Sequence, residues 1–125
     1  MAETDTGSSV RLVGLLDAVY GGDGYEMVTS SSIGGDRTAL LYDTGTVDLI
    51  DAVDLTTLGT HPVVRGQFRA DDTGDFYIYS IHLKSGSASS DKAILATETA
   101  NLRADADALS EGAHVIYAGD FNLHG

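Results

Sequence analysis

The chain has 125 residues, and its 7 Lys and Arg against 19 Asp and Glu give a formal net charge of −12 at pH 7. This length corresponds to a single domain, and so acidic a chain lacks the basic surface that binds nucleic acid by charge alone. The absence of Cys excludes disulfides and thiolate metal sites, and the sequence shows neither an apolar run long enough to span a bilayer nor a typical signal peptide.

The first half of the chain predicts one helix and three strands. Ser8-Ser9 is a suitable N-cap for an amphipathic helix over residues 10–19, which stops at Gly21-Gly22. The strands are predicted at residues 25–29, 38–42 and 47–53. A loop rich in Ser and Gly, residues 30–36, separates the first strand from the second.

The second half predicts a hairpin, a long helix and a final strand. A strand over residues 63–68 begins after the only proline, and a turn separates it from an aromatic, β-branched strand over residues 76–83. Apolar residues at helical spacing predict a helix over 91–109. The last strand, 114–118, has apolar residues on both faces and is expected to be buried on both sides. This order indicates an α/β (α+β) chain whose sheet is largely antiparallel.

The most informative motif is Gly119-Asp-Phe-Asn122, which follows the last strand. Side chains alternate along an extended chain, so Asp120 and Asn122 point the same way. A carboxylate can take a proton from water, and a carboxamide can donate hydrogen bonds to a phosphate oxygen. The alternative is a simple turn, which Asp and Asn favour after strands.

A second candidate is His82, at the end of the strand over residues 76–83. A histidine beside a Ser/Gly loop can donate a hydrogen bond to an anion, and Lys84 repeats on its face two residues later. The alternative is an exposed edge histidine without a role. The remaining histidines have no such neighbours in the sequence and are interpreted as structural or surface residues: His61, His114 and His124.

Taken together, these motifs resemble the endonuclease/exonuclease/phosphatase superfamily, which has the deoxyribonuclease-I-like fold. The resemblance covers roughly residues 25–123, including the long helix between the last two motifs. Gly-Asp-Phe-Asn is fairly specific after an apolar strand, whereas the others are informative mainly as an ordered set. The matching segments are Asp36 to Tyr42, His61-Pro62 with the strand 63–68, Phe76 to Gly86, and Gly119 to Asn122.

The resemblance implies a two-sheet α/β sandwich, mostly antiparallel with two helices, that hydrolyses phosphate esters with Mg²⁺ or Mn²⁺. Carried over, Asp120 would orient and deprotonate the attacking water, and Asn122 would bind the scissile phosphate. His82 matches a histidine that contacts phosphate, with Lys84 beside it. Arg65 is the stand-in for an arginine that many members place near the position of Pro62. Glu3 matches a metal-binding glutamate, with a disordered terminal residue as the alternative.

Two family elements have no counterpart in the sequence. The family's first strand, which carries an Asn, would precede Met1, and its late Ser-Asp-His motif would follow Gly125. We therefore expect residues 1–125 to form a single partial domain, truncated at both ends, in which the last strand lacks part of its packing. We also expect this chain alone to be inactive.

The resulting hypothesis is a fragment of a divalent-metal-dependent phosphodiesterase or nuclease. Its partner is a phosphate-ester substrate, with nucleic acid, inositol phosphates and phospholipids all open, and the sequence indicates no protein partner. Two alternatives are a non-catalytic remnant of the fold and an unrelated acidic α/β binding module. The lack of Cys fits a cytoplasmic protein, while a signal peptide ahead of Met1 would make the protein extracellular.

Overall fold

The computed structural model of the chain describes residues 6–21, 24–71 and 74–123. Two helices and six strands follow one another in this part of the chain. Their bounds are α1 Thr6–Tyr20, β1 Tyr25–Thr29, β2 Ala39–Asp43, β3 Asp48–Leu55, β4 Val63–Arg69, β5 Asp75–His82, α2 Ser89–Asp107 and β6 His114–Asp120.

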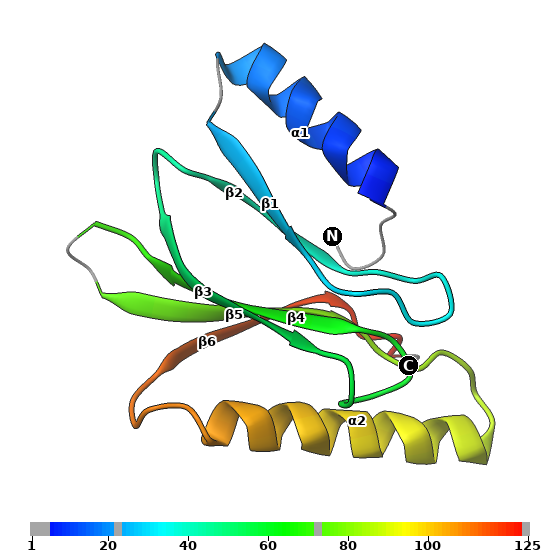
Figure 1. Ribbon diagram of the computed structural model, residues 1–125. Coiled ribbons are helices and arrows are strands. Elements are labelled where there is room, and N and C mark those ends of the chain that lie inside the picture. Colours follow the sequence, from blue (N-terminus) through cyan, green and yellow to red (C-terminus); the bar gives the residue numbers. More distant parts are fainter. Residues whose placement is uncertain (1–5, 22–23, 72–73, 124–125) are drawn as a thin grey trace.

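The elements form a layered α/β sandwich. Figure 1 shows a small sheet of β1 and β2 facing a larger sheet of four strands, with α1 lying along β1 and α2 lying under the larger sheet. This arrangement confirms the two-sheet architecture with two helices expected from the sequence. Neither helix, as far as the structure describes them, is long and apolar enough to cross a membrane.

The larger sheet has the order β3-β4-β5-β6. Strands β3, β4 and β5 pair antiparallel, whereas β6 pairs parallel to β5. A parallel neighbour needs a crossover connection, and α2 provides it between β5 and β6. Because β5 and β6 run in the same direction, their C-terminal ends lie at the same edge of the sheet.

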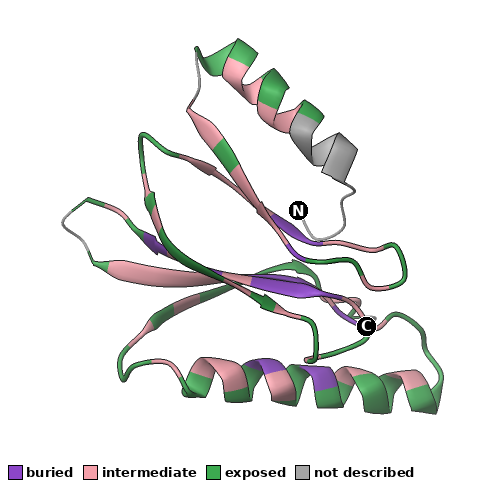
Figure 2. Ribbon diagram, viewed as in Figure 1, coloured by how far each residue is buried: buried purple, intermediate pink, exposed green. Residues whose placement is uncertain are grey.

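The best-packed core lies between the larger sheet and α2. Tyr79, Ile81 and Leu83 alternate along β5 and its end, each at most 3% exposed. They pack with Val63 of β4 and Leu102 of α2. The buried positions in Figure 2 include the middle of the sheet and the inner side of α2. Strand alternation therefore directs the even-numbered residues of β5, His82 among them, toward the opposite face.

Strand β6 is the edge of this sheet, and its burial differs from expectation. Ile116 is 48% exposed and Tyr117 is 37% exposed, although they lie on opposite faces. The expectation of a strand buried on both sides is wrong for this chain, since α2 covers only part of one face and β5 is its single neighbour among the described strands. An exposed apolar edge is unusual in a stable domain.

The observed elements match the predicted ones to within two residues at most ends. Helix α2 begins at Ser89 rather than at residue 91, because the Asp91 side chain accepts a hydrogen bond (3.3 Å) from the Ala88 N–H and so sits inside the first turn. Strand β6 runs on to Asp120, since the backbone pairing with β5 continues to that residue.

Candidate active site

The register of β5 and β6 places His82 directly opposite Asp120. Their side chains lie on one face, with 4.0 Å between His82 Nε2 and Asp120 Oδ2. This separation is too long for a hydrogen bond but short enough for both groups to contact one small ligand or water. The structure therefore brings these two predicted site residues together at one sheet edge.

Gly119 lets the two strand ends approach each other. Its φ is +137°, a conformation that side chains rarely adopt, and a Cβ there would lie 2.0 Å from the carbonyl oxygen of Ile81. Only glycine fits this contact. The glycine of the Gly-Asp-Phe-Asn motif therefore has a steric role: it holds β6 against β5 so that Asp120 stays in register with His82.

Asn122 is fixed by two hydrogen bonds just beyond β6. Its backbone N–H donates to Asp120 Oδ1 (2.9 Å), and its side-chain Nδ2 donates to the carbonyl oxygen of Leu83 (2.7 Å). Its φ of +47° is one that Asn tolerates better than most residues. The motif thus forms the turn that Asp and Asn favour after strands, and this turn leaves the other carboxylate oxygen of Asp120 on the side of His82.

The site also contains a histidine that the sequence did not single out. The ring of His61 stacks on that of His82, with centroids 3.9 Å apart and planes 13° apart. His61 Nδ1 lies 2.9 Å from Asp36 Oδ2, within hydrogen-bond distance. His61 therefore has neighbours in the structure that its surroundings in the sequence do not reveal, and its interpretation as a structural or surface residue stays a prediction. Asp36 lies in the loop between β1 and β2, and His61 lies in the loop between β3 and β4. No local sequence pattern shows that these two loops meet.

Glu98 of α2 holds the segments that carry the two stacked histidines. Its carboxylate is buried (3% exposed) and accepts hydrogen bonds through Oε1 from both the N–H (3.1 Å) and the hydroxyl (2.8 Å) of Thr60. Oε2 accepts a third from the N–H of Lys84 (3.0 Å). One side chain thus fixes the residue before His61 and the second residue after His82. Such a buried carboxylate is stabilised only while its hydrogen bonds are kept.

The two candidate cations of the phosphate site lie elsewhere. Lys84 Nζ donates to the Ser85 carbonyl oxygen (2.8 Å) and lies 3.3 Å from Asp91 Oδ1, at the start of α2. Arg65 shares a face with Val63 and contacts α2, where its Nη1 donates to Asp105 Oδ2 at 2.6 Å. The structure therefore does not bring Arg65 to the His82–Asp120 edge, because Asp105 holds it on the other face of the sheet.

The same Asp105 oxygen accepts a hydrogen bond from the Tyr79 hydroxyl. Burial, followed by this hydrogen bond to a carboxylate, raises the pKa of Tyr79 above its ordinary value of 10.0. The network of Arg65, Tyr79 and Asp105 joins β4, β5 and α2, and its role is structural.

Other predicted residues lie apart from the site or outside the described chain. Glu3 and His124 fall in segments that the structure does not describe. His114 is exposed at the start of β6, the end of the strand opposite to Asp120.

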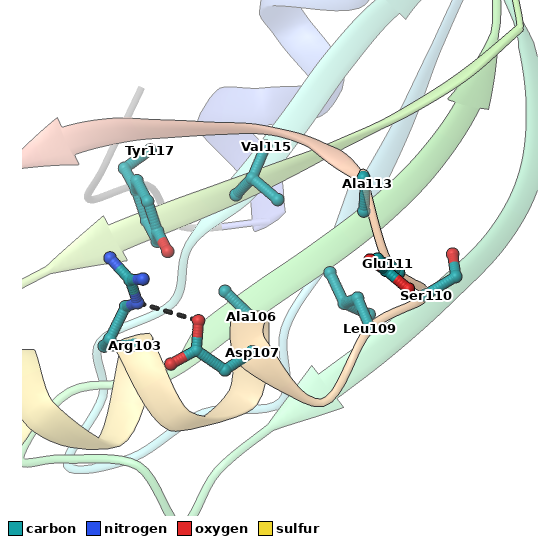
Figure 3. A pocket seen from close by; sticks show the side chains of 10 residues that line it. Arg103, Ala106, Asp107, Leu109, Ser110, Glu111, Ala113, Val115 and Tyr117 are labelled. Atoms are coloured by element: carbon teal, nitrogen blue, oxygen red, sulfur yellow. Dashed lines mark hydrogen bonds and ion pairs between the residues drawn. The ribbon is translucent and has the colours of Figure 1, made fainter.

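The groove between α2 and β6 lies on the helix-covered face, away from His82. It has a volume of about 450 Å³. Figure 3 shows side chains of α2 and β6 facing one another across it, with Arg103 Nε bound to Asp107 Oδ1 at 2.8 Å. Its lining consists of Arg103, Ala106, Asp107, Leu109, Ser110, Glu111, Gly112, Ala113, Val115 and Tyr117. None of these residues belongs to the candidate site.

Comparison with solved structures identifies the fold. A humanized D. rerio TDP2 with 14 mutations matches with a TM-score of 0.72 and 16% identity, and D. rerio TDP2 complexed with a single strand DNA product matches with 0.72 and 17%. The human Nocturnin catalytic domain with a bound sulfate anion matches with 0.70 and 17%. Each match covers 98% of this chain. The chain therefore has the fold of these structures, the deoxyribonuclease-I-like α/β fold that the resemblance implied.

The chain spans only about half of the length of these structures, namely 51%, 47% and 50% in the same order. No protein-family model matches the sequence, and no curated protein matches it significantly. At such identities the likeness establishes the fold, and activity has to be argued from the residues of this chain.

Proposed function

We propose that this chain is the part of a divalent-metal-dependent phosphodiesterase or nuclease that carries the water-activating and phosphate-binding residues. One observation carries the proposal: His82 and Asp120 are paired across β5 and β6, at the common end of the two strands, with Asn122 bound beside them. A carboxylate, an imidazole and a carboxamide gathered at one sheet edge are suited to phosphate-ester hydrolysis.

Each side chain has a distinct role in this proposal. Asp120 Oδ1 is engaged by the Asn122 N–H, so Oδ2 is the atom that orients the attacking water and takes its proton. Asn122 uses one side-chain N–H on Leu83, and the carboxamide has a second N–H for a phosphate oxygen. His82 donates from its ring to another phosphate oxygen, where it offsets negative charge.

The donor atoms at this edge suit a hard divalent cation in part. The Asp120 carboxylate is 52% exposed, and oxygen ligands are what Mg²⁺ and Mn²⁺ prefer. Glu3 remains the proposed second carboxylate ligand, although it lies outside the described residues. The ion would neutralise the phosphate charge that this acidic chain, with few cations near His82, cannot neutralise alone.

We further propose that the protein needs a second half to work. The known structures of this fold that match the chain are about twice as long, and apolar side chains of β6 are exposed on both faces at the sheet edge. Additional strands beside β6 would cover these side chains. On this view residues 1–125 form a partial domain and are inactive alone.

The proposed substrate is based on the ligands present in the structures to which this chain is similar. One TDP2 structure holds a single strand DNA product and the Nocturnin structure holds a sulfate anion, which is close to a phosphate in shape and charge. We therefore propose a phosphate-ester substrate, with nucleic acid as the first candidate. Cytoplasmic and extracellular locations both remain proposals.

The test is hydrolysis by the product of the whole reading frame that contains this chain, with DNA, RNA and phospholipid substrates, with and without Mg²⁺. We expect metal-dependent cleavage that Asp120→Asn reduces by about 10²–10⁴-fold, because a general base is lost. The control is Asp51→Asn, at an exposed site on β3.

Full activity of the Asp120→Asn variant would overturn the proposal. Substrate binding without cleavage by the wild-type protein would instead identify a non-catalytic binding module.

A further inference from the structure

We propose that Asp36, His61 and His82 form a separate binding site for one transition-metal ion of the zinc class. The three side chains come from the β1–β2 loop, the β3–β4 loop and the end of β5, and all three are partly buried. One ligand atom from each lies within 4.8 Å of the ligand atoms of the other two. Among the described residues this is the cluster with a metal-compatible composition.

The spacing is close to that of a formed site. Zinc binds nitrogen and oxygen ligands at about 2.0–2.2 Å in a tetrahedral arrangement, so two ligand atoms of one ion lie about 3.3–3.6 Å apart. His61 Nδ1 and Asp36 Oδ2, at 2.9 Å, are already this close. The remaining separations are within 4.8 Å, so a rearrangement of roughly an ångström at one ring brings all three atoms to the ion.

The donor set distinguishes this site from the proposed magnesium site. Two imidazoles and one carboxylate suit Zn²⁺, Co²⁺ and related ions, whereas Mg²⁺ prefers oxygen ligands and retains its waters. Asp120, which the hydrolysis proposal uses, is not among the three ligands. The inference therefore concerns residues that the hydrolysis proposal leaves unused, apart from His82.

The loops that carry the ligands are held by hydrogen bonds. Residues 33 and 36 exchange two backbone hydrogen bonds, of 3.1 and 3.0 Å, which close the turn ahead of the Asp36 side chain. Glu98 fixes Thr60, the neighbour of His61. Ligands held in this way lose little conformational entropy when an ion binds, which favours affinity.

The stacking of His61 on His82 means that a metal ion can bind both rings only after at least one of them rotates. The lone pair of an imidazole nitrogen lies in the ring plane, and the planes of His61 and His82 are nearly parallel, 13° apart. One ion cannot lie in both planes while the rings are stacked. Metal binding must therefore rotate at least one ring and break the stack, and this change can be observed directly.

The first experiment is calorimetric titration of the 125-residue chain with Zn²⁺. We expect one ion per chain, and we expect Asp36→Asn, His61→Asn and His82→Asn each to weaken binding at least tenfold. The matched controls are His114→Asn and Asp51→Asn, which change the same residue types at exposed positions. Affinity unchanged in the three ligand variants, or lowered equally in the controls, would overturn the inference.

A second measurement uses the unaltered chain and so does not depend on the folding of any variant. NMR of the histidine rings during Zn²⁺ addition should shift His61 and His82 together, with loss of contacts between the two rings, while His114 stays unchanged. Excess Mg²⁺ should leave these shifts in place. Shifts centred on His114, or reversal by Mg²⁺, would refute the site. Failure here leaves the hydrolysis proposal standing, because Asp36 and His61 have no part in it.

Discussion

The two faces of the four-stranded sheet are both packed, but they differ at the strand ends. On the face toward α2, apolar side chains are almost fully buried, and the polar groups of Tyr79 and Arg65 are paired with Asp105. The other face buries Val64 and Phe68, and at the strand ends polar side chains gather beside it and stay partly exposed, as His61 and His82 do. The candidate site is therefore confined to the strand ends of one face, away from the core under α2.

The largest expected effect comes from Gly119→Ala, which should break the pairing of β6 with β5 on which the candidate site depends. The added Cβ would lie 2.0 Å from the Ile81 carbonyl oxygen, in a backbone conformation with positive φ. We expect the free energy of unfolding to fall by more than about 4–5 kcal/mol, the range of exceptional substitutions, and we expect β6 to detach from β5. Urea denaturation and amide hydrogen exchange in β6 measure this.

The control for that variant is Gly112→Ala. Gly112 also has a positive φ, +76°, but no atom lies within 4 Å of an added Cβ. It should cost only the strain of the left-handed conformation, about 1–2 kcal/mol. Equal losses in the two variants would show that the close approach at Gly119 is unimportant.

The next effect in size contrasts the covered face with the open edge. Leu102→Ala removes a side chain that is 4% exposed in the core under the sheet, and we expect a loss of about 2–5 kcal/mol. Ile116→Ala, at a position 48% exposed on β6, should cost much less. Thermal or urea denaturation compares the two. A similar loss at both positions would mean that another chain or copy covers the β6 edge.

Glu98→Gln tests whether the buried carboxylate of α2 holds Thr60 and Lys84, and with them the two histidines, in place. The amide can still accept hydrogen bonds through its oxygen, but it replaces one accepting oxygen with a donor that faces an N–H or hydroxyl. We expect a loss of about 1–3 kcal/mol, as for a buried group left unsatisfied. If Glu98 positions His61, zinc affinity should also fall. Unchanged zinc affinity in a destabilised variant would limit Glu98 to a structural role.

The smallest effect concerns alkaline pH and the small sheet. Burial and the hydrogen bond to Glu26 raise the pKa of Tyr42 from 10.0 to about 12. Because the folded state holds this proton more tightly, its contribution is fully present below pH 10 and is lost as pH rises toward 12. Urea denaturation at pH 8 and pH 11 should show a smaller decline for Tyr42→Phe than for the wild type. Identical declines would contradict this.

Local sequence predicted the elements well because their signals are local. Strand β5 is rich in aromatic and β-branched residues, and α2 has helical apolar spacing, so both were located within two residues. His82 and Asp120 each stand at the end of a strand with a clear local signal, and the pairing of these strands brings the two side chains together. By contrast, Asp36 and His61 join the site through loops whose meeting depends on distant contacts, such as that of Thr60 with Glu98.

The ion-pair partners of the candidate cations, Arg65 and Lys84, could not be predicted from the sequence either. Nothing near Arg65 in the sequence reveals that Asp105, 40 positions away, will bind it on the helix-covered face. Lys84 forms an ion pair with Asp91, in the first turn of α2, because the loop before α2 brings the two side chains together. Charge can be read from a sequence, but the partner of a charge is set by tertiary packing.

The parallel pairing of β5 and β6 has a consequence for how the chain acquires its site. The two strands can pair only after α2 has formed and folded back, so His82 and Asp120 meet through a non-local contact, which forms slowly compared with a hairpin. A slip of one residue would turn Asp120 to the other face of the sheet. Partly folded chains therefore keep His82 and Asp120 apart, and contact between these two residues reports the fraction of molecules that have finished folding.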